Sequence, residues 1–223
     1  MIDPEHSSAE PIALFGGTFD PVHYGHLRCA DEARQKLGLK YLYLLPAGSP
    51  AHRDTPQATV KQRLAMLELA CHEFAFLRVD DRETRRSGPS YMVDTLREVH
   101  AGLPGRSILL LVGQDAANQL QTWFHWEQLF DLAHIVILTR PGACSQYQPE
   151  LARQIQPRSV TDVRELRKSR AGLVLHMEVE SIDVSASNIK RIIRQGSSPG
   201  PVLPASVLEY IEENRLYINT LPG

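Results

Sequence analysis

The sequence has few cysteines and no long apolar run. Its three cysteines stand far apart among 223 residues and form no CxxC pair, so we expect reduced thiols in a cytoplasmic protein. The longest apolar runs, such as Ile108–Val112, fall far short of the roughly 18–20 residues of a membrane span. Residues 1–10 lack the basic start and apolar core of a signal peptide, and we expect them to form a disordered tail.

The chain also lacks an excess of positive charge. Its 24 Lys and Arg residues face 26 Asp and Glu residues, for a formal charge of −2, which excludes a strongly basic nucleic-acid footprint. It has no HExxH or paired-cysteine zinc pattern, and no acidic cluster that marks a metal cage. We therefore expect a single domain over residues 11–219, with no nucleic-acid partner, no membrane partner and no metal held by protein side chains.

Short continuous apolar runs alternate with amphipathic segments along most of the chain. The runs predict buried strands, and the segments, with apolar residues at helical spacing, predict helices. We expect strands over residues 11–15, 41–45, 77–79, 107–112, 134–138 and 174–179. This alternation predicts an α/β fold, a Rossmann-like doubly wound parallel sheet with helices on both faces and small C-terminal helices. Residues 142–170 are polar and aperiodic and are expected to form a surface insertion.

Several predicted helices have recognisable starts. Thr59 and Gln62 form a capping box before a helix whose apolar face extends to Phe74. Ser90 is expected to cap the next helix and Ser187 to begin a later one. A second capping box, formed by Ser206 and Glu209, is expected to begin the last helix.

The most informative stretch is Gly16–His26, GGTFDPVHYGH, where the first predicted strand gives way to the first helix. The two glycines lack Cβ, so phosphates can approach the backbone, and the helix offers free N–H groups with a positive dipole end. His23 and His26 can both turn toward one anion, while Gly25 leaves space for a ligand. A turn alone or half of a zinc site would explain parts of this pattern, but the whole combination predicts a nucleotide site.

This stretch resembles the H-x-G-H signature of the nucleotidyltransferase superfamily related to class I aminoacyl-tRNA synthetases. Together with other segments that recur in the same order, it makes the chain similar to the bacterial nicotinate mononucleotide adenylyltransferases from Ile12 to Tyr217. Those segments are LPAGSPAHR, RRSGPSYMVDTL, VGQD, TWFHW, TRPG and DVSASNIK. The resemblance implies an enzyme of NAD biosynthesis that joins ATP to nicotinate mononucleotide, with Mg2+ bound with ATP, and makes deamido-NAD and pyrophosphate.

The resemblance also implies which residues bind the phosphates. His23 and His26 match the catalytic pair that contacts the ATP phosphates, and Ser185 and Ser187 match a second phosphate motif. Lys190 stands where the family usually has arginine, so it keeps the charge and loses the bidentate fork; Arg191 or Arg194 are possible substitutes. Asp20 is expected to orient its turn or to be purely structural. The phosphate-side residues are Gly16, Gly17, Thr18, Phe19, Ser185, Ser187 and Lys190.

A second group is implied to bind the nucleosides and the acceptor. Gly113 and Asp115 match the family's ribose contact, with a helix N-cap as the alternative role of Asp115. Trp123 matches the tryptophan that stacks on the pyridine ring, while Trp126 is expected in the core. For nicotinate mononucleotide the resemblance adds Thr84, Tyr91, Ser49 and His52, and leaves Arg85 and Arg86 as either carboxylate partners or a charged surface loop.

Two alternatives stay open at this point. A related adenylyltransferase with another acceptor, nicotinamide mononucleotide or pantetheine phosphate, would keep the same fold and phosphate site. A non-catalytic nucleotide-binding protein would keep only the binding. The intact histidine pair favours an enzyme, and the acidic balance argues against an RNA-binding relative.

Overall fold

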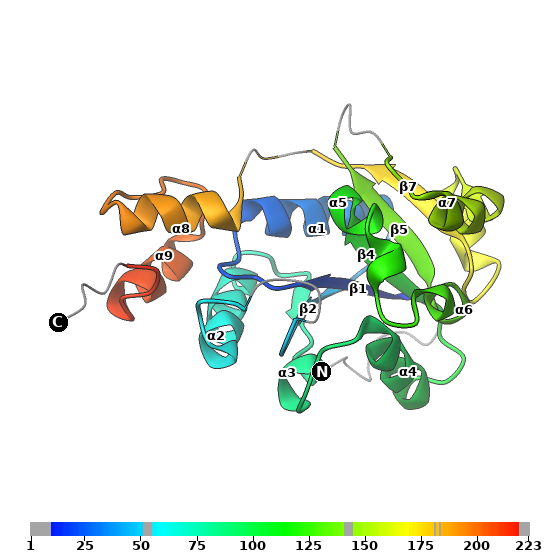
Figure 1. The fold of residues 1–223 in the computed structure, drawn as a ribbon, viewed down its shortest axis with the longest axis horizontal. Helices are drawn as coiled ribbons and strands as arrows, with labels where there is room; N and C mark the ends of the chain where they lie inside the picture. Colours follow the sequence, from blue (N-terminus) through cyan, green and yellow to red (C-terminus); the bar gives the residue numbers. More distant parts are fainter. Residues whose placement is uncertain (1–9, 51–54, 141–144, 181, 183, 219–223) are drawn as a thin grey trace.

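The computed structural model describes residues 10–50, 55–140, 145–180, 182 and 184–218. These residues form a seven-stranded sheet in which every strand runs parallel to its neighbours, in the order β3-β2-β1-β4-β5-β7-β6 (Figure 1). The predicted Rossmann-like parallel sheet is confirmed, with one strand more than the sequence indicated. The strands are β1 (Ile12–Gly17), β2 (Leu42–Pro46), β3 (Leu77–Val79), β4 (Ile108–Gly113), β5 (His134–Thr139), β6 (Ser159–Val160) and β7 (Val174–Glu178).

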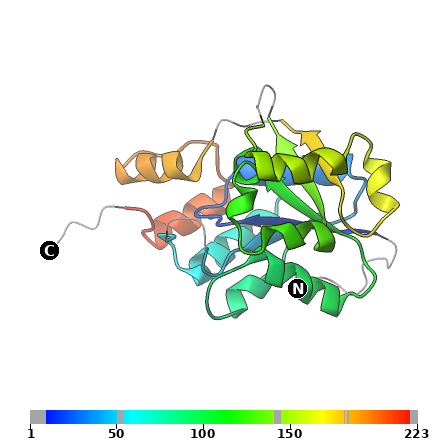
Figure 2. The same cartoon turned by 45° about the vertical axis from the view of Figure 1, so that its right-hand side comes forward.

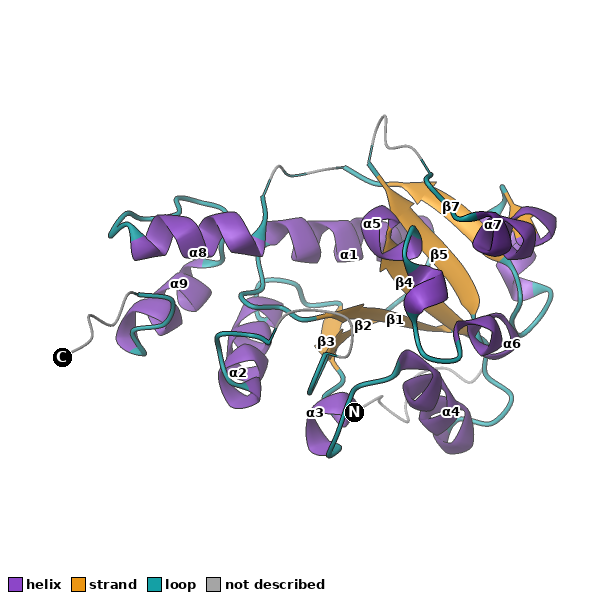
Figure 3. Cartoon of the chain, in the orientation of Figure 1, coloured by secondary structure: helices purple, strands orange, loops and turns teal. Residues whose placement is uncertain are grey.

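Helices connect the strands, as the colouring of Figure 3 shows. The α-helices are α1 (Tyr24–Lys36), α2 (Val60–Cys71), α3 (Arg82–Arg85), α4 (Met92–Gly102), α5 (Gln114–Ala117), α6 (Leu129–Leu132), α7 (Pro149–Ile155), α8 (Ala186–Arg194) and α9 (Ala205–Glu213). Short 3-10 helices cover Leu120–Thr122, Trp126–Gln128, Gln156–Arg158 and Val163–Arg167. None of the helices in the described part of the chain has the length and apolar character that crossing a membrane requires.

Both faces of the sheet are covered, which confirms the doubly wound arrangement. Successive side chains of a strand point to opposite faces, so Ala13 and Phe15 of β1 join one apolar core while Ile12 and Leu14 join the other. Helices α1, α2, α8 and α9 bury side chains in the first core, and α4, α6 and α7 bury theirs in the second. Strands buried on both faces are therefore apolar throughout, as the sequence showed.

Helix α2 begins as predicted. The hydroxyl of Thr59 accepts a hydrogen bond from the backbone N–H of Gln62 (3.3 Å), and the Gln62 side chain accepts one from the N–H of Thr59 (2.9 Å). The helix ends at Cys71, before Phe74, and its buried side includes Met66, Leu67 and Ala70. This capping box satisfies donors that the first turn would otherwise leave open.

Three other predicted helix starts are wrong. Tyr91 is the N-cap of α4, and the Ser90 hydroxyl instead accepts hydrogen bonds from the backbone N–H groups of Gly48 and Ser49. Helix α8 is capped by Ser185, whose hydroxyl accepts from Asn188 N–H (3.2 Å), so Ser187 lies inside the first turn. Helix α9 follows Pro204, which places Ser206 and Glu209 within the helix. In each case a neighbouring residue takes the N-cap position.

The segment expected to be an aperiodic insertion contains ordered elements in its described part, residues 145–170. Helix α7 buries Leu151 and Ile155, and the 3-10 helix Val163–Arg167 buries Leu166. The two residues of β6 pair with Val174 and Leu175 of β7 and form the edge of the sheet. Elements of seven residues or fewer are too short to show a period in the sequence, which explains why they were missed.

The strand order reverses direction between β1 and β4. From β1 the chain builds β2 and β3 on one side, and from β4 it builds the remaining strands on the other. In open α/β sheets, ligands bind outside the carboxyl ends of the strands at such a switch point. Figures 1 and 2 show α8 and α9 at one end of the molecule beside the C-terminus, with α7 toward the opposite end.

Candidate active site

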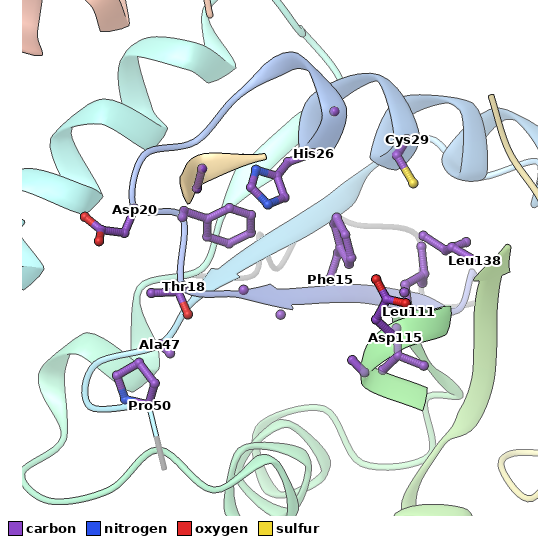
Figure 4. A pocket seen from close by; sticks show the side chains of 18 of the residues that line it. Phe15, Thr18, Asp20, His26, Cys29, Ala47, Pro50, Leu111, Asp115 and Leu138 are labelled. Atoms are coloured by element: carbon purple, nitrogen blue, oxygen red, sulfur yellow. The ribbon is translucent and has the colours of Figure 1, made fainter. Parts of the chain in front are cut away.

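A pocket of about 840 Å3 lies at the carboxyl ends of β1 and β4. Figure 4 shows Asp20 and His26 on one side of this pocket, Asp115 on another, and Ala47 and Pro50 on a third. Sequence segments far apart therefore meet around one cavity, at the position that the topology indicates. Of the predicted site residues, the pocket is lined by Gly16, Gly17, Thr18, Phe19, Tyr91, His23, His26, Gly113, Asp115, Trp123, Ser185, Ser187 and Lys190.

The glycines of the β1–α1 turn make room for protein side chains. A Cβ on Gly17 would lie 2.8 Å from the Phe19 ring, and one on Gly25 would lie 2.8 Å from Cγ1 of Val184 and 3.0 Å from Nδ1 of His23. Gly25 lines the pocket, while Val184 and His23 occupy the space that a Cβ at this position would need, so the role of Gly25 in leaving space for a ligand stays a prediction. Phe19 itself has a φ of 50°, in the left-handed region of backbone conformation that residues other than glycine rarely adopt.

The two histidines of the turn lie face to face. His23 is the N-cap of α1, and its ring stacks on that of His26 with centroids 3.7 Å apart and planes 21° apart. The Phe19 ring meets His26 edge-on at 5.1 Å. Burial, with a smaller contribution from the positive charge of Arg140, lowers the pKa of His23 to about 4. His23 is therefore neutral at pH 7, and a neutral imidazole can donate one N–H bond to an anion.

Nδ1 of His23 is buried and has no hydrogen-bond partner among the described residues. A buried polar atom of this kind costs free energy unless a ligand or water satisfies it. Its position at the start of α1 suits the oxygen of a phosphate, although the backbone N–H groups of Tyr24 and His26 already donate to the carbonyl oxygens of Val202 (3.0 Å) and His23 (2.9 Å).

Asp20 connects the turn to the other walls of the site. Its carboxylate is only 4% exposed and accepts hydrogen bonds from Nζ of Lys190 and the hydroxyl of Tyr217, both at 2.8 Å. It also accepts from the backbone N–H groups of Gln57 (3.0 Å) and Ala58 (3.1 Å). Burial alone would raise the pKa of Asp20, but these four hydrogen bonds outweigh it and hold the pKa below its usual range.

Arg63 of α2 forms hydrogen bonds with two loops of the pocket. It lies on the buried side of α2 and is 1% exposed. Its Nη1 donates to the carbonyl oxygen of Thr18 (2.8 Å), and its Nη2 donates to that of Gly48 (3.0 Å). The turn after β1 and the loop after β2 are thus held at a fixed separation by one guanidinium fork.

Helix α8 supplies the wall nearest to the histidines. Ser185, Ser187 and Lys190, which the resemblance implies as phosphate ligands, all line the pocket. Arg191 and Arg194 do not line it; Arg191 instead donates to the side chains of Asn188 (2.7 Å) and Gln195 (3.2 Å). Neither arginine therefore replaces Lys190 at this wall.

The end of β4 forms the opposite wall. Gly113 is the N-cap of α5, and Asp115 lies in the first turn with its side chain exposed at the pocket. Because Gly113 holds the cap position, the alternative role of Asp115 as a helix N-cap is excluded. An exposed carboxylate facing a pocket is a suitable acceptor for hydroxyl groups.

Aromatic side chains form the remaining part of the pocket. Trp123 is half-buried and lines it, whereas Trp126 is buried in the second core and meets Phe130 edge-on. Tyr91 also lines the pocket, and Phe124 stacks on it with ring centroids 4.4 Å apart and planes 29° apart. Phe124 is 44% exposed, so this aromatic group is open to solvent.

Some of the residues predicted to bind the acceptor do not line the pocket. Thr84 does not line the pocket, and its hydroxyl donates to the carbonyl oxygen of Asp81 (2.6 Å). Ser49 does not line it either, and its backbone pairs with Ser90. Arg85 and Arg86 instead pair with acidic neighbours, Arg85 with Asp81 and Arg86 with Glu83 and Glu98. His52 lies outside the described residues.

Other lining or supporting residues were missed from the sequence. Arg63 could have been noticed, since an arginine four residues before Leu67 falls on the apolar side of its helix. Glu83 lines the pocket, accepts from the Thr95 hydroxyl (2.6 Å), and has its pKa raised by burial. Arg140 and Phe124 also line it; they lie within the segments TRPG and TWFHW, but neither was given a role from the sequence.

The described residues include no group of three or more histidine, cysteine, aspartate or glutamate side chains able to hold a metal ion. A divalent metal that acts together with ATP would therefore need ligands other than such a group among the described side chains. The nucleotide phosphates would then supply the oxygen ligands that such a cation prefers.

The comparisons with known proteins agree with this geometry. A family model described as cytidylyltransferase-like matches residues 14–192, so the chain belongs to the cytidylyltransferase-like nucleotidyltransferases. A relative from Acidithiobacillus ferrooxidans, named probable nicotinate-nucleotide adenylyltransferase, is 41% identical and covers 95% of this chain and 98% of its own. One of the same name from Pseudomonas aeruginosa is 44% identical over 92% of this chain and 96% of its own. Within that class, the chain is a member of the nicotinate-nucleotide adenylyltransferase family of enzymes, which confirms the resemblance seen in the sequence.

A solved structure shares the fold. It is the Plasmodium falciparum nicotinic acid mononucleotide adenylyltransferase complexed with NaAD, with a TM-score of 0.72 at 14% identity. The match covers 93% of this chain and 97% of that one. At this identity the likeness shows the fold alone.

Proposed function

We propose that this protein transfers the adenylyl group of ATP to nicotinate mononucleotide, giving deamido-NAD and pyrophosphate, with residues 11–219 acting as one domain. The observation that carries the proposal is a single pocket lined by the histidine pair, by Lys190 of α8, by Asp115 and by Trp123. The histidine pair and Lys190 suit phosphates, the Asp115 carboxylate suits the hydroxyl groups of a ribose, and the Trp123 ring suits an aromatic ring. The family membership and the names of the relatives support the same reaction.

The phosphate chemistry needs no covalent intermediate on the protein. A phosphate oxygen of the mononucleotide attacks the α-phosphorus of ATP, a new P–O bond forms, and the bond to pyrophosphate breaks. The attacking phosphate is already anionic, so catalysis consists of positioning and of stabilising negative charge. We assign this role to His23 and His26. Gly16, Gly17, Thr18, Phe19, Ser185, Ser187 and Lys190 would bind the ATP phosphates.

Recognition of the sugars and the acceptor ring is assigned to the other walls. The Asp115 carboxylate, beside Gly113, would accept hydrogen bonds from ribose hydroxyls, and the Trp123 ring would stack on the pyridine. Tyr91 also lines the pocket and stacks on Phe124, which follows Trp123 in the sequence. Thr84, Ser49 and His52 stay predictions for mononucleotide binding, since Glu83 and Pro50, next to two of them, line the pocket.

Mg2+ is proposed as the divalent metal. It prefers oxygen ligands, keeps several waters and commonly arrives bound to substrate phosphates, which fits a site without an all-protein metal cage among the described residues. When bound, it would neutralise part of the phosphate charge. A cytoplasmic setting is also proposed, on the basis of free Cys29 and Cys71.

The test is pyrophosphate release from ATP and Mg2+ with three acceptors in parallel. We expect strong release with nicotinate mononucleotide and much weaker release with nicotinamide mononucleotide or 4′-phosphopantetheine. Release with only one of the latter two would overturn the acceptor and keep the phosphate chemistry. No release with any of them, despite ATP binding, would reduce the protein to a nucleotide-binding function.

A further inference from the structure

The carboxylate of Asp20 accepts four hydrogen bonds that its place in a turn does not explain. It collects donors from the segment before α2, from α8 and from the residues after α9, which are all distant in sequence. Both of its oxygens are used: Oδ1 accepts from Tyr217 and Ala58, and Oδ2 from Lys190 and Gln57. A D-P turn needs none of these contacts for its own stability.

Lys190 connects this cluster to the pocket. Its side chain is 16% exposed, and its ammonium lies 2.8 Å from Oδ2 of Asp20 and 5.8 Å from the centre of the Tyr217 ring. An ammonium has three donors, and the bond to Asp20 uses one of them. Because Lys190 also lines the pocket, the remaining donors are available on the side where the phosphates are proposed to bind.

A lysine on a flexible stem is normally a poorly oriented phosphate ligand, since it lacks the rigid fork of arginine. Here the Asp20 carboxylate, itself fixed by the Tyr217 hydroxyl and two backbone N–H groups, holds the ammonium in one direction. The ion pair has no net charge, so Asp20 does not repel an incoming polyphosphate as a bare carboxylate would.

We propose that Asp20 is a positioning residue for ATP binding: it acts through Lys190, whose ammonium it aims at the nucleotide phosphates, and Tyr217 fixes Asp20 in turn. This inference rests on the proposed function, because it assigns the phosphates of ATP to the end of the pocket at Lys190. It makes a residue from the end of the described chain part of the machinery that binds the nucleotide.

The experiment is a double-mutant cycle read by equilibrium binding of ATP without any acceptor. The variants are Asp20→Asn, Lys190→Met, both together, and Tyr217→Phe. We expect Asp20→Asn and Lys190→Met each to weaken ATP binding about tenfold, the double variant to be no weaker than Lys190→Met alone, and Tyr217→Phe to weaken it roughly threefold. The KM for nicotinate mononucleotide should change less than about twofold, since we assign Lys190 to the phosphates of ATP and not to the acceptor.

Matched controls separate positioning from general stability. Asp131→Asn on α6, Lys61→Met on α2 and Tyr210→Phe on α9 make the same chemical changes elsewhere and should leave ATP binding unchanged. If Asp20→Asn fails to fold, the cycle is run with Tyr217→Phe and Lys190→Met, because Tyr217→Phe removes only one hydroxyl. Strictly multiplicative losses, equal weakening of ATP and mononucleotide, or unchanged ATP binding in the folded variants would each overturn the inference.

Since the binding measurement uses ATP alone, it remains decisive even if the acceptor is not nicotinate mononucleotide. Failure of the acceptor test with an intact cycle would correct the proposed reaction only. An intact acceptor preference with independent effects of Asp20 and Lys190 would correct the inference only.

Discussion

The two ends of the pocket are built in different ways. At the end near α8, buried charges and hydrogen bonds fix the side chains: Asp20 has four donors and Arg63 spans two loops. At the other end, Tyr91, Trp123 and Phe124 present partly exposed rings, and those of Tyr91 and Phe124 stack on each other. Polar networks satisfied in this way specify one geometry, whereas stacked rings can slide at small cost.

This difference matches what each end is proposed to do. Stabilising charge on a phosphate in the transition state requires donors that are already in place, because reorganisation would consume the gain. Binding a flat ring requires only an apolar face and tolerates adjustment. We therefore expect substitutions at the fixed end to change turnover or ATP binding, and those at the aromatic end to change mainly acceptor affinity.

The largest expected effect is at the fixed end. His26→Ala should lower turnover by roughly 100- to 1,000-fold, equivalent to about 3–4 kcal/mol of transition-state stabilisation. The reason is the loss of a donor that we propose to act on the reacting phosphates. Steady-state pyrophosphate release checks this, and near-normal turnover in a folded variant would remove the phosphate role from His26.

The buried His23 at the same end should make the stability of the folded protein depend on pH. Burial lowers the pKa of His23 to about 4 in the folded protein, below the ordinary 6.5 of the unfolded chain. The folded state thus binds fewer protons, so this contribution to stability is complete above about pH 6.5 and is lost as the pH falls toward about 4. The loss is on the order of 3 kcal/mol.

Urea unfolding at pH 7.5 and pH 4.5 measures it. His23→Gln should reduce the difference in unfolding free energy between the two pH values, because the substituted side chain does not titrate. His72→Gln, at an exposed histidine after α2, is the matched control and should retain the difference. An unchanged pH difference in His23→Gln would show that His23 is not held neutral.

At the aromatic end the expected effects are smaller. Trp123→Ala should weaken nicotinate mononucleotide about tenfold, since stacking on an aromatic face contributes on the order of 1–3 kcal/mol. The Kd for ATP should change much less. Separate binding titrations with the two ligands decide this, and equal weakening of both would mean that Trp123 supports the fold instead.

The smallest effect should come from the outermost ring. Phe124→Ala removes the partner that stacks on Tyr91, and we expect the KM of the acceptor to rise about two- to threefold because such pairs contribute roughly 0.5–1.5 kcal/mol. Phe76→Ala is the control, since Phe76 is 47% exposed and does not line the pocket. A large fall in turnover for Phe124→Ala would break the proposed contrast between the two ends.

Much of the fold was predictable because strands buried on both faces leave an unambiguous apolar pattern. The runs at 107–112 and 134–138 became the central strands β4 and β5, and the capping box of Thr59 and Gln62 begins α2. The edge strand β6 was missed because two residues cannot show a pattern. Ser90 was misassigned because its hydroxyl satisfies the loop after β2 instead of its own helix.

The site was predictable where chemistry is concentrated in a short motif, as in Gly16–His26. It was not predictable where function depends on partners far apart in sequence. The bonds of Asp20 to Lys190 and Tyr217, and those of Arg63 to Thr18 and Gly48, follow from the packing of α2, α8 and α9. For the same reason the sequence did not indicate that Val184 and His23 pack against Gly25.

The hydrogen bond between Asp20 and Tyr217 joins residues 197 positions apart. During synthesis on the ribosome, the turn that carries the histidines emerges early, and domains begin to fold from the N-terminal side. The last donor to Asp20 emerges only after the intervening residues up to Tyr217 have been made. A nascent chain that has already formed β1 and α1 therefore still lacks the Tyr217 hydroxyl, and the nucleotide site that we propose is complete only after Tyr217 has joined it.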